Sequence, residues 1–189
     1  MVIRSTFFSI FIGSVSVRMR TIVYRLWQVR QQLGFVAPLA AEERQWVARW
    51  LPASALPLFQ TMSAADQRHS LRVCQGLLAR GCADRDLLAA ALLHDVGKAR
   101  GRVPFWTRPV LVLGKVLAPR LLVRLAVDPR TNRALSRWRR EISNAWWHAE
   151  IGAELAAAAG LSEQAALYIR THHQPDGPAA ELHLVDEAS

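Results

Sequence analysis

The 189-residue chain is poor in cysteine, in tyrosine and in alternating β-branched residues. Its two cysteines, Cys74 and Cys82, have a spacing that matches neither a zinc knuckle nor a redox pair. We therefore expect two small buried thiols in a reducing compartment. The scarcity of strand-like alternation, together with many leucines and alanines, predicts an all-α fold.

Long hydrophobic runs are also missing. The apolar run at 7–12 is too short to span a bilayer, and no small-residue cleavage site follows it, so we expect neither a transmembrane span nor a signal peptide. Met19 begins a better helical sequence than Met1, and either methionine can be the native start. The length fits one domain at 41–189, preceded by a basic, apolar arm and first helix at 1–40. The arm either packs on its own domain or lies on an anionic membrane.

Acidic residues are absent from 1–41 and nearly absent from 98–140. The net charge of +9 is therefore local, and the last part of the chain, 141–189, is acidic. Residues 99–142 form a basic insertion in which two short amphipathic helices are expected around Pro119. Three interpretations remain open: an apolar face on the core with solvated arginines, a membrane-surface module, or arginines that attract a polyanionic nucleotide. No motif for sequence-specific recognition of nucleic acid is present.

Helix boundary signals are clear between 60 and 100. Ser63 begins one helix, which Gly81 ends. Asp84 begins a second, apolar helix that delivers His94 and Asp95. Gly97 is expected to close that helix. The His-Asp pair offers one nitrogen and one oxygen ligand, which suits a transition metal, but a core histidine bonded to a backbone carbonyl would give the same dipeptide.

The acidic part of the chain holds the other histidines. A helix is predicted from Asn144 to Ala159, in which His148 and Gly152 share one face. Gly160 ends this helix, and Ser162 begins the next, which leads to a His172-His173 pair. A short segment follows, in which Asp186 is a candidate ligand near a fraying end and His183 is expected at the surface.

Five motifs occur in a fixed order, and together they resemble the HD superfamily of metal-dependent phosphohydrolases over about residues 60–189. The motifs are Arg68-His69-Ser70-Leu71, Leu92-Leu93-His94-Asp95-Val96-Gly97-Lys98, His148-Ala149-Glu150-Ile151-Gly152, His172-His173 and Leu184-Val185-Asp186-Glu187. The resemblance implies an HD-type helical bundle. The doubled histidine is similar to the HDIG and HD-GYP branch, whereas the Gly-Tyr-Pro loop of the latter is missing after His173.

The resemblance also implies a metal centre for one or two divalent transition metal ions, Mn, Fe, Ni, Co or Zn. One metal would be held by His69, His94, Asp95 and Asp186. A second metal, sharing Asp95, would be held by His148, His172 and His173. Asp95, Lys98 and His148 are the expected catalytic residues, and Lys98, Arg100 and Arg102 the expected contacts to substrate. Ala65 stands where members with three metals have a glutamate, so a third metal is not expected.

The expected function is therefore hydrolysis of a phosphomonoester or phosphodiester, in a nucleotide, by a metal-activated water. The missing Gly-Tyr-Pro loop makes specificity for cyclic dinucleotides doubtful. The alternative is a non-catalytic module of the same fold that binds a nucleotide or a signalling partner. The expected location is the cytoplasm, and the basic insertion leaves open a peripheral contact with the inner face of an anionic membrane. The sequence does not determine the oligomeric state.

Overall fold

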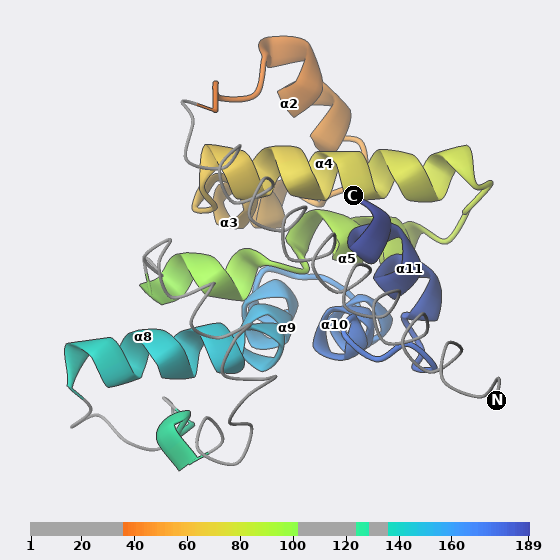
Figure 1. The fold of residues 1–189 in the computed structure, drawn as a ribbon. Coiled ribbons are helices and arrows are strands. Elements are labelled where there is room, and N and C mark those ends of the chain that lie inside the picture. Colours follow the sequence, from red (N-terminus) through yellow and green to blue (C-terminus); the bar gives the residue numbers. More distant parts are fainter. Residues whose placement is uncertain (1–35, 102–123, 129–135) are drawn as a thin grey trace, which may run out of the picture. The chain divides into compact units, whose positions relative to one another are not determined.

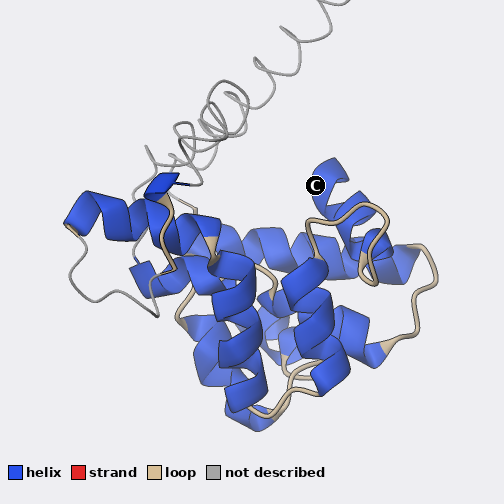
Figure 2. Cartoon of the chain, turned by 90° about the horizontal axis from the view of Figure 1, so that it is seen from below, coloured by secondary structure: helices blue, strands red, loops and turns tan. Residues whose placement is uncertain are grey.

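The computed structural model of the protein describes residues 36–101, 124–128 and 136–189. Every regular element in these ranges is a helix (Figure 2), which confirms the all-α prediction. The chain divides into two compact units, 1–37 and 38–189, where the sequence had predicted a boundary after residue 40. The predicted arm, with its alternative starts, lies outside the described residues apart from its last few positions. The second unit carries all the candidate ligands.

The described chain begins with short elements that pack on the core. Helix α2 (Ala41–Val47), the 3-10 turn η1 (Ala53–Ala55) and helix α3 (Leu56–Gln60) follow one another. Pro52 precedes the turn, as expected from a residue that cannot continue a helix. Val47 and Phe59 are buried in the main core, so these elements are scaffold.

Helices α4 (Ala64–Ala79) and α5 (Arg85–Leu93) begin at the predicted caps. The Ser63 hydroxyl accepts a hydrogen bond from the backbone N–H of Asp66, and the Asp84 carboxylate accepts from two N–H groups of the first turn of α5. Gly81 ends the α4 segment with a φ of +87°, a conformation that favours glycine. All residues of α5 from Leu87 onward are buried, which makes it the central helix.

Gly97 does not close α5, contrary to the prediction. Helix α5 ends at Leu93 with His94 as its C-cap, and Gly97 lies in the following 3-10 turn η2 (Val96–Gly101). A Cβ atom at Gly97 would stand 2.0 Å from the carbonyl oxygen of His148. Glycine is needed here because two backbone segments meet, not because the helix stops.

The helix predicted from Asn144 to Ala159 is in fact two helices. Helix α8 (Arg137–Trp146) and helix α9 (His148–Ala158) are separated by Trp147. The Trp147 indole donates a hydrogen bond to the carbonyl oxygen of Ala126, a tertiary contact that the local sequence does not encode. Helix α8 also crosses the end predicted for the basic insertion at 142. The two amphipathic helices predicted around Pro119 lie outside the described residues, except for their last two positions.

Helices α10 (Glu163–Thr171) and α11 (Ala180–Ala188) complete the unit. Helix α10 packs on α9 and α5, α4 packs on α5 and α11, and η2 contacts α8 and α9. Figure 1 shows α9 and α10 side by side near α5, with the C-terminus at the end of α11. The core buries Leu77, Leu88, Leu92, Ile169 and Leu182. It brings the ends of α5, α8 and α10 together.

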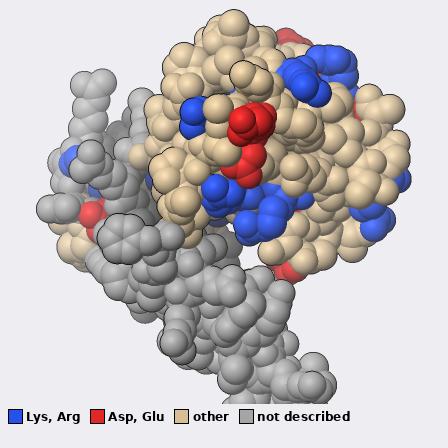
Figure 3. All heavy atoms as spheres, turned by 90° about the horizontal axis from the view of Figure 1, so that it is seen from above, with Lys and Arg blue, Asp and Glu red and all other residues tan. Residues whose placement is uncertain are grey.

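The described surface is not uniformly basic. On the face drawn in Figure 3, Lys and Arg side chains form separate groups, and one of these groups adjoins Asp and Glu side chains. None of the helices in the described part of the chain combines the length and the apolar character that crossing a bilayer requires.

Candidate metal centre

Three histidines occupy the ends of three helices. His94 is the C-cap of α5, His172 is the C-cap of α10, and His148 follows the break after α8. Each imidazole Nδ1 bonds the backbone carbonyl oxygen three residues earlier. These acceptors belong to Ala91, Ile169 and Ala145, at 2.8, 2.6 and 2.8 Å. Each ring therefore bonds a carbonyl in the last turn of the preceding helix, where helix ends leave carbonyls without a partner.

This arrangement sets the chemistry of the other ring nitrogen. A carbonyl oxygen can only accept, so Nδ1 of each ring must carry a hydrogen, and Nε2 of the neutral ring then has a lone pair. The Nε2 atoms of His94 and His172 are buried and have no hydrogen-bond partner. The alternative of an ordinary core histidine thus accounts for one nitrogen of His94 and leaves the other unexplained. Orphaned buried acceptors of this kind fit metal ligands whose second nitrogen is held by a carbonyl.

A first ligand group surrounds His94. One donor atom from each of His69, His94 and Asp95 lies within 4.8 Å of the others. Asp186 joins this group, because its Oδ1 is 2.8 Å from Nε2 of His69 and 3.5 Å from Nε2 of His94. His69 comes from the second turn of α4 and Asp186 from α11. The packing of α11 on α4 thus brings together His69 and Asp186, the first and last candidate ligands along the chain.

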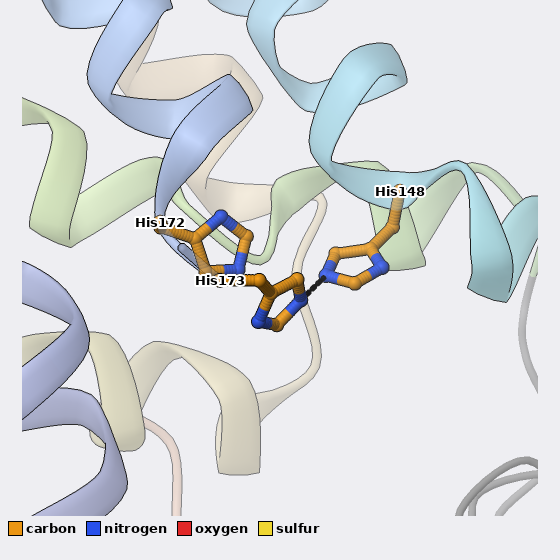
Figure 4. A group of neighbouring side chains, drawn as sticks. All are labelled: His148, His172 and His173. Carbon is orange, nitrogen blue, oxygen red and sulfur yellow. Dashed lines mark hydrogen bonds between the residues drawn. The ribbon is translucent and has the colours of Figure 1, made fainter. Parts of the chain in front are cut away.

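A second ligand group consists of His148, His172 and His173, whose donor atoms also lie within 4.8 Å of one another. Figure 4 shows the rings turned toward one another, with His148 on α9 and the other two at the end of α10. Nε2 of His173 is 3.0 Å from Nε2 of His148. His172 is fully buried and His173 is exposed, so the group runs from the interior to the surface.

Asp95 lies between the two groups. Its Oδ2 is 3.6 Å from Nε2 of His94, and its Oδ1 is 3.7 Å from Nε2 of His148. The carboxylate is buried, and its two oxygens face different imidazoles. The Lys98 ammonium, one turn on, contacts Oδ1 at 2.5 Å. One side chain can therefore serve both groups.

The surroundings keep both carboxylates ionised. Burial acts to raise the pKa of Asp95, but Lys98, His94 and His148 outweigh it, and the pKa lies well below the usual range. The pKa of Asp186 is likewise lowered despite burial, because His69 hydrogen-bonds to it and the His94 imidazole lies 3.5 Å away. Both groups are thus anionic near neutral pH.

The imidazoles differ in how they respond to their surroundings. Burial, reinforced by the charge of Lys98, lowers the pKa of His148 to about 3. Burial also depresses the pKa of His172 well below the usual value, and neighbouring His94 adds to this effect. The pKa of His94 changes in the opposite direction. Burial acts to lower it, but the negative charges of Asp95 and Asp186 outweigh burial and raise it. His148 and His172 are therefore neutral near pH 7 and can donate a lone pair to a cation.

The donor set fits a divalent transition metal. Imidazoles mixed with carboxylates suit Mn, Fe, Co, Ni or Zn, whereas Ca and Mg prefer oxygen ligands alone. The structure brings all seven predicted ligands into one region. These are His69, His94, Asp95, His148, His172, His173 and Asp186. Lys98 lies at the centre, whereas Arg102 and the side chain of Arg100 are outside the described residues.

His183 is not the surface residue that the sequence predicted. Its ring is half-buried, and its Nδ1 lies 3.1 Å from the carbonyl oxygen of His172. Because a carbonyl only accepts, His183 donates this bond and ties α11 to the turn that holds two ligands. Its spacing of three residues from Asp186 places both on one helix face, but nothing in the local sequence indicates a bond to the carbonyl of His172.

Comparison with known proteins identifies no relative: no protein-family model, no curated protein and no solved structure matches this chain.

Proposed function

We propose that this chain is a metal-dependent phosphohydrolase that cleaves a phosphomonoester or phosphodiester bond in a nucleotide. The observation that carries the proposal is the position of Asp95. Its two oxygens face two separate groups of histidines, and the Lys98 ammonium adjoins one of them. The order of motifs, which resembles that of HD-superfamily phosphohydrolases, supports the same assignment.

The residues of the first group, with two imidazoles and two carboxylates, would hold one divalent metal ion. The three imidazoles of the second group, with the other oxygen of Asp95, would hold another. Metal ions bound in this way supply a nucleophilic water at neutral pH and neutralise charge on a phosphoryl group. The protein's own task is then to place ligands, to exclude bulk water from one side and to hold the phosphate.

Differences in burial support an approach of the substrate from one side. His94 and His172 are fully buried and form its floor. Lys98, with 27% of its side chain exposed, and the exposed His173 lie on the solvent side. A phosphate ester would therefore approach past Lys98, which can donate hydrogen bonds to a phosphoryl oxygen while the ester's leaving group stays near solvent.

His148 is best suited to act as a ligand. With a pKa of about 3, its ring is neutral near pH 7 and cannot serve as a proton donor at that pH. Its Nδ1 hydrogen is held by the carbonyl of Ala145, so only Nε2 is available to the site. The expected catalytic role of His148 is thus to hold and orient, not to transfer a proton.

The test compares Asp95→Asn with Asp176→Asn, which removes an exposed carboxylate of the same type. Each protein is loaded with Mn²⁺ and assayed on a nitrophenyl phosphate monoester, a nitrophenyl phosphate diester and a panel of nucleotides. Because Asp95 serves both groups, Asp95→Asn should lower kcat/KM by more than the roughly 10- to 100-fold typical of residues that only support a ligand. Asp176→Asn should leave the rate unchanged.

Two results would contradict the hydrolase assignment. A Mn²⁺-loaded wild-type protein that cleaves no ester and no nucleotide would be a metal-binding module of the alternative kind. Equal rates for wild-type protein and Asp95→Asn would show that any hydrolysis does not depend on this site.

A further inference from the structure

The two ligand groups differ in the negative charge that they offer. The first group contains the carboxylates of Asp95 and Asp186. The second group contains three imidazoles, and Oδ1 of Asp95 lies 3.7 Å from Nε2 of His148. Since a divalent cation gains more from two carboxylates than from part of one, the first group should bind metal more tightly.

Lys98 makes this difference larger. Its ammonium contacts Oδ1 of Asp95 at 2.5 Å, and the same oxygen is 3.7 Å from Nε2 of His148. A cation bound by His148 and Oδ1 would have to share that oxygen with a positive charge already in contact with it. Two positive charges at one carboxylate oxygen in a mostly buried site repel each other strongly.

We propose that Lys98 competes with the second metal ion for Oδ1 of Asp95, so that the group of His148, His172 and His173 is filled second and only when the ammonium withdraws. This inference rests on the metal centre of the proposed function. It assigns to Lys98 a role in controlling metal occupancy in addition to contact with a phosphate.

The side chain of Lys98 is able to make this movement. The backbone N–H of Lys98 donates to the carbonyl oxygen of Asp95 at 3.0 Å, which fixes the backbone of η2. The side chain itself is 27% exposed and has a flexible four-carbon stem, so the ammonium can turn toward solvent without a change of fold. Once withdrawn, it lies on the open side of the site.

Lys98 lies close to the second group. Oδ1 of Asp95, which the ammonium contacts, is 3.7 Å from Nε2 of His148, so a cation bound at this ring would stand near the charge of Lys98. Repulsion by this charge acts on any cation that His148 would bind. Withdrawal of Lys98 thus links two events. The second group can bind its metal ion, and the ammonium becomes available to a phosphoryl oxygen on the solvent side of the site.

The test is a calorimetric titration of metal-free protein with Mn²⁺. Wild-type protein should show one tight and one weak dissociation constant. Lys98→Gln removes the charge, and it should tighten the weak constant within the roughly 5- to 150-fold range typical of coupled sites while leaving the tight constant unchanged. Lys98→Arg keeps the charge and should resemble wild type. Arg80→Gln, at the exposed residue that follows α4, controls for the loss of one positive charge elsewhere.

The outcomes separate this inference from the proposed function. A weak constant that Lys98→Gln leaves unchanged, or makes weaker, would overturn the competition and leave the hydrolase assignment intact. A protein that binds no Mn²⁺ at all would overturn both. Metal binding that follows the expected pattern without any hydrolysis would support the competition and contradict only the hydrolase assignment.

Discussion

At the scale of single residues, His94, His148 and His172 make the same local hydrogen bond. Each ring caps the end of a helix through Nδ1 and presents Nε2 to the site. For His94 and His172 this nitrogen is buried without a partner, which costs a metal-free protein about 1–3 kcal/mol for each acceptor. Metal binding would satisfy both atoms, so we expect stability and metal occupancy to be linked.

His183 provides a test of how the second group is positioned. Replacing it with Phe keeps a ring of similar size but removes the donor to the carbonyl oxygen of His172. We expect Mn²⁺ binding at the second group to weaken by about tenfold or more, as for other residues that support a ligand, with no change at the first group. His183→Asn, whose amide can donate from a similar position, should restore most of the affinity. Equal affinities in all three proteins would show that this bond has no positioning role.

That these histidines and aspartates come together could be predicted from the sequence, because their types, order and spacing carry the signal. His69 and Asp186 are far apart in the chain, yet the resemblance placed them in one set and the structure places them 2.8 Å apart. The bond of His183 and the capping bonds of the three histidines could not be predicted, because they depend on where helices end and on which backbone carbonyl faces each ring.

At the scale of elements, the contact between η2 and α9 positions the two halves of the site. Gly97 in η2 lies directly against the backbone of His148, so that Asp95 and His148 are held at their observed separation. This contact depends on the absence of a side chain at one position. It joins the segment that carries the shared carboxylate to the helix that carries the first ligand of the second group.

We predict that Gly97→Ala destabilises the fold by about 1–3 kcal/mol, as overpacking against fixed backbone typically does. The added Cβ would stand 2.0 Å from the carbonyl oxygen of His148, so η2 and α9 would have to separate. Gly152→Ala is the matched control on the same interface, since its nearest contact would be a side-chain carbon at 3.3 Å. Urea unfolding measures both effects. A loss in Gly97→Ala no greater than that in Gly152→Ala would contradict this account.

Local signals predicted where three of the helices start. Ser63, Asp84 and Ser162 all accept hydrogen bonds from the first turns that follow them. The break at Trp147 was missed because neither glycine nor proline marks it. It arises from the tertiary bond of the indole to Ala126 and from the capping of α8 by the His148 ring. Periodicity alone cannot distinguish one continuous helix from two that meet at a ligand.

For the molecule as a whole, the buried imidazoles predict a pH-dependent stability. The pKa values of His148 and His172 lie below the ordinary value of 6.5. As the pH falls below about 6.5, the unfolded chain therefore binds more protons at these residues than the folded chain does, and the folded state loses stability. The lowered pKa values of Asp95 and Asp186 act in the same direction below about 3.8. The raised pKa of His94 acts oppositely, since its stabilising contribution is present at low pH and lost as the pH rises.

Two depressed imidazoles outweigh one raised imidazole, so we expect the free energy of unfolding of the metal-free protein to fall as the pH is lowered from about 7 to about 4. Urea unfolding at a series of pH values, with a chelator present, measures this. The substitution His148→Gln should flatten the curve because it removes one of the responsible groups. A stability that rises on acidification of the wild-type protein would contradict the assigned pKa directions.

The fold class followed from composition, because a chain rich in leucine and alanine with capping residues at helical intervals has few alternatives to a helical bundle. The excess positive charge also followed from the sequence, but all of it lies in ranges that the structure does not describe. On the described face in Figure 3, groups of both signs are present. The central claim therefore rests on the buried ligands and not on the basic segments.

That claim is tested most directly by the metal content of the purified protein after equilibrium dialysis against excess Mn²⁺, measured by elemental analysis. The two ligand groups predict two metal ions per chain, and fewer in His94→Ala, which lacks a ligand of the first group. A wild-type protein that retains no more Mn²⁺ than the surrounding buffer would contradict the existence of the metal centre.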